Sequence, residues 1–134
     1  MKLIFDSSAL IAYLKNEDGA EIAENLLYDM DNSCYIHAVN LCEVYYEARR
    51  CGGEETALAT LQTIYNSGLH VIEDMDEDFW LFAGRIKADY KRVSLADCFC
   101  ISLSNRLNAE IITSDTHELL PLADAGLCKV RFIR

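Results

Sequence analysis

The first buried segment of this chain, Leu3-Ile4-Phe5, constrains the fold more than any other stretch. Three consecutive apolar residues without polar alternation are typical of a strand buried on both faces of a parallel sheet. The run stops at Asp6, which precedes two serines and an apolar helical segment at 9–14. Open α/β sheets bind ligands at the carboxyl ends of their strands, so Asp6 is a candidate site residue. An Asp before a helix is also an ordinary N-cap, and Asp6 alone does not separate these interpretations.

Short apolar strands and amphipathic helices alternate along the rest of the chain. Further strands are predicted at 34–37, 69–72, 111–113 and 128–132, the last of them an edge strand. Helices are predicted at 20–30, 41–51, 54–66, 79–90 and 94–105, with a short helical turn after Asp115. Gly52-Gly53 is predicted to separate the helices 41–51 and 54–66. Strands joined by helices form βαβ units, so we expect an α/β fold: a three-layer α/β/α sandwich with a mainly parallel central sheet.

Length and composition narrow the class of protein. A chain of 134 residues with 6 Gly and 1 Pro suits one compact domain, residues 1–134. No apolar run reaches the roughly 20 residues of a membrane helix, and Met1-Lys2 leads straight into a strand, so we expect a cytoplasmic protein. The net charge of −10 argues against bulk electrostatic binding of nucleic acid but not against local recognition. The 6 Cys lack C-x-x-C spacing and are predicted to be buried free thiols.

Four carboxylates stand at comparable positions in this pattern. Asp6 and Asp115 follow buried strands, whereas Glu43 and Asp97 occupy the first turns of predicted helices. Each has a structural explanation, because Asn40-Leu41-Cys42-Glu43 and Ser94-Leu95-Ala96-Asp97 resemble capping boxes and Asp115 could cap its own helix. Helix N-termini that follow parallel strands nevertheless lie at one edge of the sheet, where the four side chains could converge.

Carboxylates held close together repel one another unless a cation lies between them. A hard divalent ion with oxygen ligands, Mg²⁺ or Mn²⁺, is the natural occupant of such a cluster. Its retained waters can be activated for attack on a phosphodiester. The hydroxyls of Ser8, Thr113 and Ser114 are predicted to orient the carboxylates.

The order and spacing of these segments resemble the acidic signature of PIN-domain ribonucleases, and especially of VapC-like toxins of bacterial toxin–antitoxin systems. The resemblance rests on Asp6-Ser7-Ser8-Ala9 after a strand, Asn40 to Val44, Ser94 to Asp97, and Thr113-Ser114-Asp115 after a strand. It covers nearly the whole chain. It implies metal-dependent cleavage of RNA, with Asp6, Glu43, Asp97 and Asp115 at the metal-binding positions.

The same resemblance implies a cognate antitoxin protein that blocks the site, and commonly a homodimer. Some relatives carry another acid two residues after the fourth position, where this chain has His117. His117 is therefore either a catalytic or RNA-contacting residue or, more simply, a helix-start residue or a partly buried imidazole. Two other classes of function stay open: a metal-dependent phosphatase or phosphotransfer domain with Asp6 as nucleophile, and a non-catalytic interaction module with a degenerate site.

Three further features have simpler explanations. The acidic run Glu73 to Asp78 lacks the Gly and the later Glu of a calcium-binding EF-hand loop, so it is interpreted as a solvated helix start. The aromatic residues near Trp80 and Tyr46 are interpreted as core or subunit interface. Basic pairs such as Lys91-Arg92 suit helix ends, although pairs close to the acidic residues could steer RNA phosphates.

Overall fold

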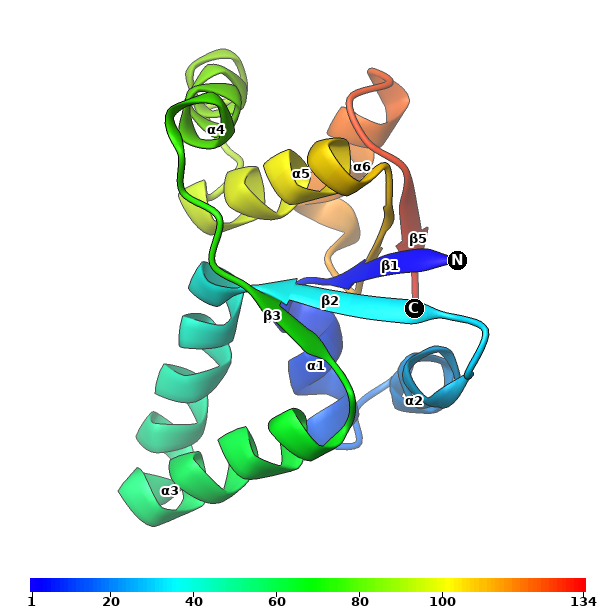
Figure 1. Ribbon diagram of the computed structural model, residues 1–134, viewed down its shortest axis with the longest axis vertical. Coiled ribbons are helices and arrows are strands. Elements are labelled where there is room, and N and C mark those ends of the chain that lie inside the picture. The colour runs from blue at the N-terminus through cyan, green and yellow to red at the C-terminus, as the bar shows by residue number, and fades with distance from the viewer.

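The computed structural model describes all residues, 1–134, and places a five-stranded sheet between two layers of helices (Figure 1). The chain runs through β1 (Lys2–Phe5), α1 (Ser7–Leu14), α2 (Ala20–Tyr28), β2 (Ser33–His37), α3 (Ala38–Asn66), β3 (His70–Ile72), α4 (Glu77–Asp89), α5 (Leu95–Leu107), β4 (Glu110–Thr113), α6 (Thr116–Asp124) and β5 (Val130–Phe132). In Figure 1, α1, α2 and α3 lie on one side of the sheet and α4, α5 and α6 on the other. The predicted three-layer α/β/α sandwich is confirmed.

All four strand pairs are parallel, and the strand order is β3-β2-β1-β4-β5. The chain builds β1, β2 and β3 outward in one direction and then crosses back to add β4 on the other side of β1. Ligand sites of open α/β sheets lie beyond the carboxyl ends of the strands, at the point where this direction reverses. That point is between β1 and β4, the strands that lead to Asp6 and Asp115.

The alternation of side chains along β1 divides the interior into two cores. Leu3 and Phe5 face the core beneath α1, α2 and α3, whereas Ile4 faces the core beneath α4, α5 and α6. All three side chains are fully buried, as the apolar run predicts for a strand covered on both faces. None of the helices is both long and apolar enough to span a bilayer.

The helices predicted at 41–51 and 54–66 form one element, α3, which bends at Gly53. Gly53 has φ 84° and ψ 177°, a left-handed conformation that side chains with a Cβ rarely adopt. The chain therefore turns a corner here without an intervening loop, as the bend of α3 shows in Figure 1. The N-terminus of α3 also differs from the prediction, because the helix begins at Ala38, directly after β2.

The prediction that the thiols are buried is wrong for Cys42 and Cys51, which are exposed on α3. Leu41 and Val44 define the buried side of this helix. Cys42 is rotated about 100° from Leu41, since successive helical residues differ by that angle, and it therefore leaves the core. Cys34, Cys98 and Cys100 are buried as predicted.

The acidic run after β3 is held in place by the side chain of Arg106. The Arg106 guanidinium binds Asp76 through Nη1 and Nη2, at 2.5 and 2.8 Å, and binds Asp74 at 3.1 Å. It also lies over the ring of Phe79, 5.1 Å from the centroid. Asp76 begins α4 without a side-chain capping bond. The run is thus a helix start that is held to α5 by Arg106.

Candidate metal centre and active site

Asp6 lies directly after β1 with its side chain 1% exposed. Its Oδ1 accepts hydrogen bonds from Ser8 Oγ at 2.7 Å and from the Ala9 amide at 2.9 Å. Its Oδ2 accepts a hydrogen bond from Thr113 Oγ1 at 2.5 Å. Asp6 is therefore the N-cap of α1, and its carboxylate is at the same time tied to the end of β4.

The hydroxyls of Ser8 and Thr113 connect Asp6 to the turn after β4. Each donates its single proton to Asp6 and accepts a backbone N–H: Ser8 from Ser114 at 3.1 Å, and Thr113 from Asp115 at 2.9 Å. The side chain of Ser114 has a different partner, because its hydroxyl accepts a hydrogen bond from Arg134 at 3.2 Å. Ser8 and Thr113 thus fix the orientation of Asp6, whereas Ser114 takes part through its backbone.

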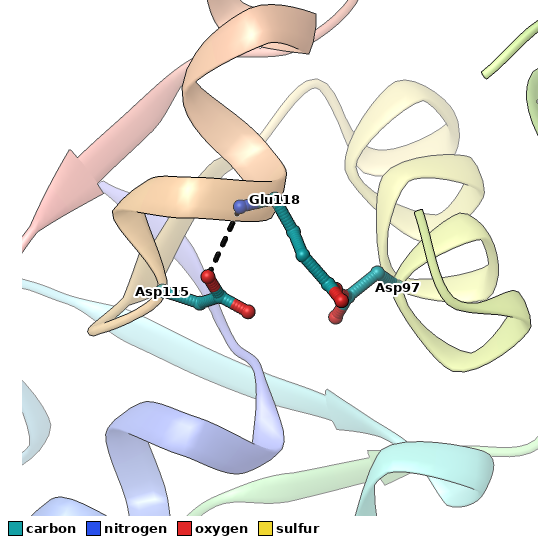
Figure 2. A group of neighbouring side chains, drawn as sticks. All are labelled: Asp97, Asp115 and Glu118. Atoms are coloured by element: carbon teal, nitrogen blue, oxygen red, sulfur yellow. Dashed lines mark hydrogen bonds between the residues drawn. The ribbon is translucent and has the colours of Figure 1, made fainter. Parts of the chain in front are cut away.

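Three carboxylates gather where the N-termini of α5 and α6 meet (Figure 2). Asp97 lies in the first turn of α5, Asp115 is the N-cap of α6, and Glu118 lies in the first turn of α6. One oxygen from each residue lies within 4.8 Å of the others. Figure 2 shows the carboxylates of Glu118 and Asp97 side by side, with that of Asp115 facing them.

Glu118 reaches Asp97 because its own helix cap is only half complete. In a capping box the side chain at this position would bind the N–H of the cap residue. Here Asp115 Oδ1 accepts from the Glu118 amide at 3.0 Å, but the Asp115 N–H already donates to Thr113. The Glu118 carboxylate is therefore free to turn towards α5.

Burial raises the proton affinity of these acids. The pKa of Asp97 lies well above its ordinary value because of burial, the hydrogen bond with Glu118, and the charges of Asp6 and Glu118. Burial raises the pKa of Asp6 to about 6, although the hydrogen bonds from Thr113, Ala9 and Ser8 act in the opposite direction. The ion pairs of the protein involve other carboxylates, so no Lys or Arg neutralises this cluster.

Glu43 stands beside this cluster, on α3. Ser7 Oγ donates to Glu43 Oε1 at 3.0 Å, and the half-buried carboxylate has a raised pKa, chiefly because of burial and also because of the charge of Glu118. Glu43 is not a member of the group of three carboxylates within 4.8 Å. The structure thus brings Asp97 and Asp115 together with Glu118, with Asp6 and Glu43 on the adjoining strand end and helix.

The capping-box interpretation of Asn40 and Glu43 is wrong. The cap of α3 is His37, whose Nδ1 accepts the Val39 N–H at 3.1 Å. Asn40 is instead completely buried in the first turn of α3, where its Nδ2 donates to the Ala96 carbonyl of α5 at 3.3 Å. This neutral bond joins the helices that carry Glu43 and Asp97. At Ser94 the N-cap half of the predicted capping box is present, since Ser94 Oγ accepts the Asp97 N–H at 3.1 Å.

The sequence patterns did not predict the contacts that Glu118, Ser7 and Asn40 make, although Asn40 lies in one of the motifs. Glu118 was visible only as the third helical residue after Asp115, a spacing that predicts a cap and gives no reason to expect a contact with α5. The Ser7 hydroxyl binds Glu43 on α3, 36 residues away, which no local pattern predicts. His117 is exposed in the first turn of α6, next to Glu118.

The sequence matches the family model of the PIN domain over residues 3–123. The chain belongs to the PIN domain family. This match spans β1 to most of α6 and so includes all the acidic residues described above. No curated protein sequence matches the chain.

Solved structures agree with this PIN domain in fold. A DNA-bound VapBC from Salmonella typhimurium superposes with a TM-score of 0.76 at 16% identity, covering 100% of this chain and 99% of that one. VapBC-1 from nontypeable Haemophilus influenzae gives 0.75 at 17% identity, covering 99% and 98%. The sarcin-ricin loop cleaving toxin VapC20 of Mycobacterium tuberculosis gives 0.72 at 16% identity, covering 96% and 98%.

Proposed function

We propose that this PIN domain is a divalent-cation-dependent endoribonuclease, the toxin of a toxin–antitoxin pair. The observation that carries the proposal is the group of Asp97, Asp115 and Glu118, whose carboxylates lie within 4.8 Å of one another without a basic partner. Such a group of carboxylates is unfavourable without a bound cation, since burial and like charge both penalise ionisation. The raised pKa of Asp97 is the signature of that penalty.

The donor set suits Mg²⁺ or Mn²⁺. All the available ligands are carboxylate oxygens, which hard divalent cations prefer, and no Cys or His belongs to the group. Asp97, Asp115 and Glu118 would hold the cation, with Asp6 beside them. When bound, the cation supplies charge stabilisation at the phosphate and lowers the pKa of a coordinated water.

The other residues orient the site and handle protons. Ser8, Thr113 and the Ala9 amide bind both oxygens of Asp6 and so hold this carboxylate in one orientation. Asn40 holds α3 against α5. Glu43, with its raised pKa and its Ser7 contact, is suited to take a proton from the attacking water or to give one to the leaving oxygen.

RNA is the proposed substrate, an antitoxin protein the proposed inhibitor, and a homodimer the proposed assembly. Support for the first comes from the structural neighbour described as a sarcin-ricin loop cleaving toxin. Support for the second comes from the neighbours described as VapBC and toxin–antitoxin complexes. Exposed Trp80 and Tyr46, at 46% and 43%, offer aromatic surface for an interface between subunits.

The phosphotransfer alternative is weakened by the geometry of Asp6. A nucleophilic carboxylate needs an accessible oxygen, but Asp6 is 1% exposed and both of its oxygens accept hydrogen bonds from Ser8, Ala9 and Thr113. The nuclease proposal predicts that no acyl-phosphate forms on this residue.

Thermal unfolding with and without Mn²⁺ or Mg²⁺ tests the proposal. The wild type should gain stability in millimolar metal, because a ligand that binds only the native state stabilises it. Asp97→Asn should lose this gain. Asp76→Asn serves as the matched control, since it makes the same chemical change at a carboxylate bound to Arg106, and it should keep the gain.

Cleavage of a labelled RNA, incubated with the same proteins, completes the test. Metal-dependent cleavage by the wild type and by Asp76→Asn, but not by Asp97→Asn, supports the nuclease. A wild type that neither gains stability in metal nor cleaves RNA contradicts it and favours the non-catalytic interaction module.

A further inference from the structure

Some of the basic residues of this acidic protein form ion pairs with carboxylates, and others have no such partner. Five of the 12 Lys and Arg form ion pairs with carboxylates: Lys15, Arg49, Arg106, Arg131 and Arg134. Lys91 and Arg92 form none, and both are exposed on the turn that joins α4 to α5. They are therefore available to an anionic ligand.

Lys91 and Arg92 line a hollow of about 500 Å³ between this turn and α6. Tyr90 lies beside them, and His117 and Glu118 contribute the opposite wall. Ligand sites for small molecules commonly have volumes in this range. The hollow thus combines two cations, two flat rings and one member of the acidic cluster.

The turn that carries the two cations is fixed in place. Lys87 Nζ donates to the carbonyls of Lys91 and Val93, at 2.9 and 2.6 Å. Val93 is anchored in the core at 3% exposure, and its N–H donates to the Tyr90 carbonyl at 3.2 Å. Lys91 and Arg92 therefore project from a backbone that is already ordered, which lowers the entropy that a ligand must offset.

The opposite wall connects the hollow to the acidic cluster. Glu118 lines the hollow and also contributes one of the three carboxylates within 4.8 Å. A phosphate bound at the cluster would therefore have its neighbouring nucleotide within reach of the hollow. The acidic surroundings repel further phosphates, so the next phosphate of a strand is best placed where unpaired cations stand.

We propose that this hollow binds the nucleotide next to the scissile phosphate in a single-stranded segment of the substrate RNA. Lys91 and Arg92 bind its phosphate, and Tyr90 or His117 stacks against its base. Cations combined with aromatic rings are how proteins bind single strands without sequence preference. The inference rests on the proposed nuclease function and names the form of RNA that the site accepts.

Binding of a 12-nucleotide fluorescein-labelled single-stranded RNA of mixed sequence, measured by anisotropy in EDTA, tests the hollow apart from cleavage. The test variant is Lys91→Gln/Arg92→Gln. The control is Lys2→Gln/Lys129→Gln, which removes the same amount of positive charge. Lys2 begins β1 and Lys129 precedes β5, so both lie at the amino ends of the parallel strands, away from the acidic residues at the carboxyl ends. The test variant should bind roughly tenfold more weakly and the control almost as the wild type does.

The salt dependence of binding adds a second measurement. Loss of the single phosphate that Lys91 and Arg92 neutralise should reduce the magnitude of the slope of log K against log salt by about 0.7. In Mg²⁺, the test variant should cleave with a raised KM and an unchanged kcat, because the contact binds substrate and transition state alike. A 4-thiouridine RNA should crosslink to the peptide that contains Tyr90 or His117.

The outcomes separate this inference from the nuclease proposal. In one outcome, the wild type cleaves RNA while the two double variants have equal RNA affinity, equal salt dependence of binding and equal KM. That result contradicts RNA binding in the hollow and leaves the nuclease proposal intact. Selective loss of RNA affinity in Lys91→Gln/Arg92→Gln without cleavage by any protein supports the hollow as an RNA site, but it overturns the nuclease and with it the assignment of the bound nucleotide to a scissile phosphate. Unchanged RNA affinity in Lys91→Gln/Arg92→Gln overturns the inference, whatever else the hollow binds.

Discussion

Two groups of carboxylates in this protein differ in whether the chain supplies their counter-ion. Asp74 and Asp76 follow β3 and bind Arg106, and this partner lowers the pKa of Asp76 to about 2. Asp97, Asp115 and Glu118 meet without a basic residue, and the pKa of Asp97 is raised. The first group completes its own charge balance, whereas the second needs an ion from outside. A metal site is therefore indicated less by the number of acidic residues than by carboxylates that are withdrawn from solvent and lack a built-in cation.

The same Asp-to-Asn change should have opposite consequences in the two groups. Asp97→Asn should reduce metal-dependent RNA cleavage by roughly 10³-fold, because a carboxylate that holds the cation is lost. Asp76→Asn should cleave at the wild-type rate. Initial rates on one labelled RNA at saturating Mg²⁺ measure both. Equal activity of the two variants would remove the distinction between the groups.

The groups should also respond oppositely to pH in metal-free protein. Asp6 has a folded pKa of about 6, above the ordinary value of about 3.9, so the native state binds more protons between these values. Stability should therefore fall as pH rises from about 4 past 6, by on the order of 3 kcal/mol for Asp6, and the raised pKa of Asp97 extends the fall upward. Asp76, with its lowered pKa, loses its contribution only as pH falls from about 4 towards 2.

Urea unfolding in EDTA at pH 5 and pH 8 measures this difference. We expect the metal-free wild type to be more stable at pH 5. Asp97→Asn should show a smaller fall, because Asn mimics the protonated acid at every pH. Stability that stays flat or rises between pH 5 and pH 8 would contradict the assignment of raised pKa values to the cluster.

Asp6, beside the acidic cluster, is held in place by neutral hydrogen-bond donors, whereas Asp74 and Asp76 are held by the charged Arg106. Thr113→Val removes the hydroxyl that donates to Asp6 and accepts the Asp115 N–H, at nearly constant volume. It should lower the free energy of unfolding by about 2 kcal/mol, because two buried polar groups lose a partner. The loss should be larger at pH 8 than at pH 5, since ionised Asp6 needs the donor more. Thr113→Ser keeps the hydroxyl and should retain most of the stability.

Removal of the built-in cation should have the smallest effect. Arg106→Gln leaves Asp74 and Asp76 unpaired, but both are partly exposed and water can solvate their charges. The melting temperature should fall less than in Thr113→Val, and the difference from wild type should shrink further in high salt. Mn²⁺ should restore little, since an exposed pair of acids does not form a closed site. A strong rescue by Mn²⁺ would show that burial is not what distinguishes the two groups.

The apolar pattern of each segment was sufficient to predict the fold, and β1 shows why. Leu3 and Phe5 pack into one core and Ile4 into the other, so an uninterrupted apolar run is what a central parallel strand requires. The element order followed, because each strand and helix carries its own periodicity. The prediction failed where geometry between residues decides, as at Cys42, which follows apolar Leu41 but points away from the core.

The site shows the same division. Asp6, Asp97 and Asp115 could be selected by their places at strand ends and helix starts, which are local properties. Glu118 could not, because its approach to Asp97 depends on Thr113 having already taken the Asp115 N–H. Asn40 could not, because its partner is a carbonyl on another helix, 56 residues further along the chain.

The direct junction of β2 and α3 limits how this domain can change in length. His37 is the last residue of the strand and Ala38 the first of the helix, so no loop separates them. Each residue advances a helix by about 100°, and one inserted residue here would rotate Asn40 away from α5 and Glu43 away from Ser7 of α1. The bend at Gly53 lies further along the same helix, beyond Asn40 and Glu43. An insertion or deletion between His37 and Glu43 should therefore disturb the site, whereas one near Gly53 should disturb the core packing of Ala57 and Ile64 instead.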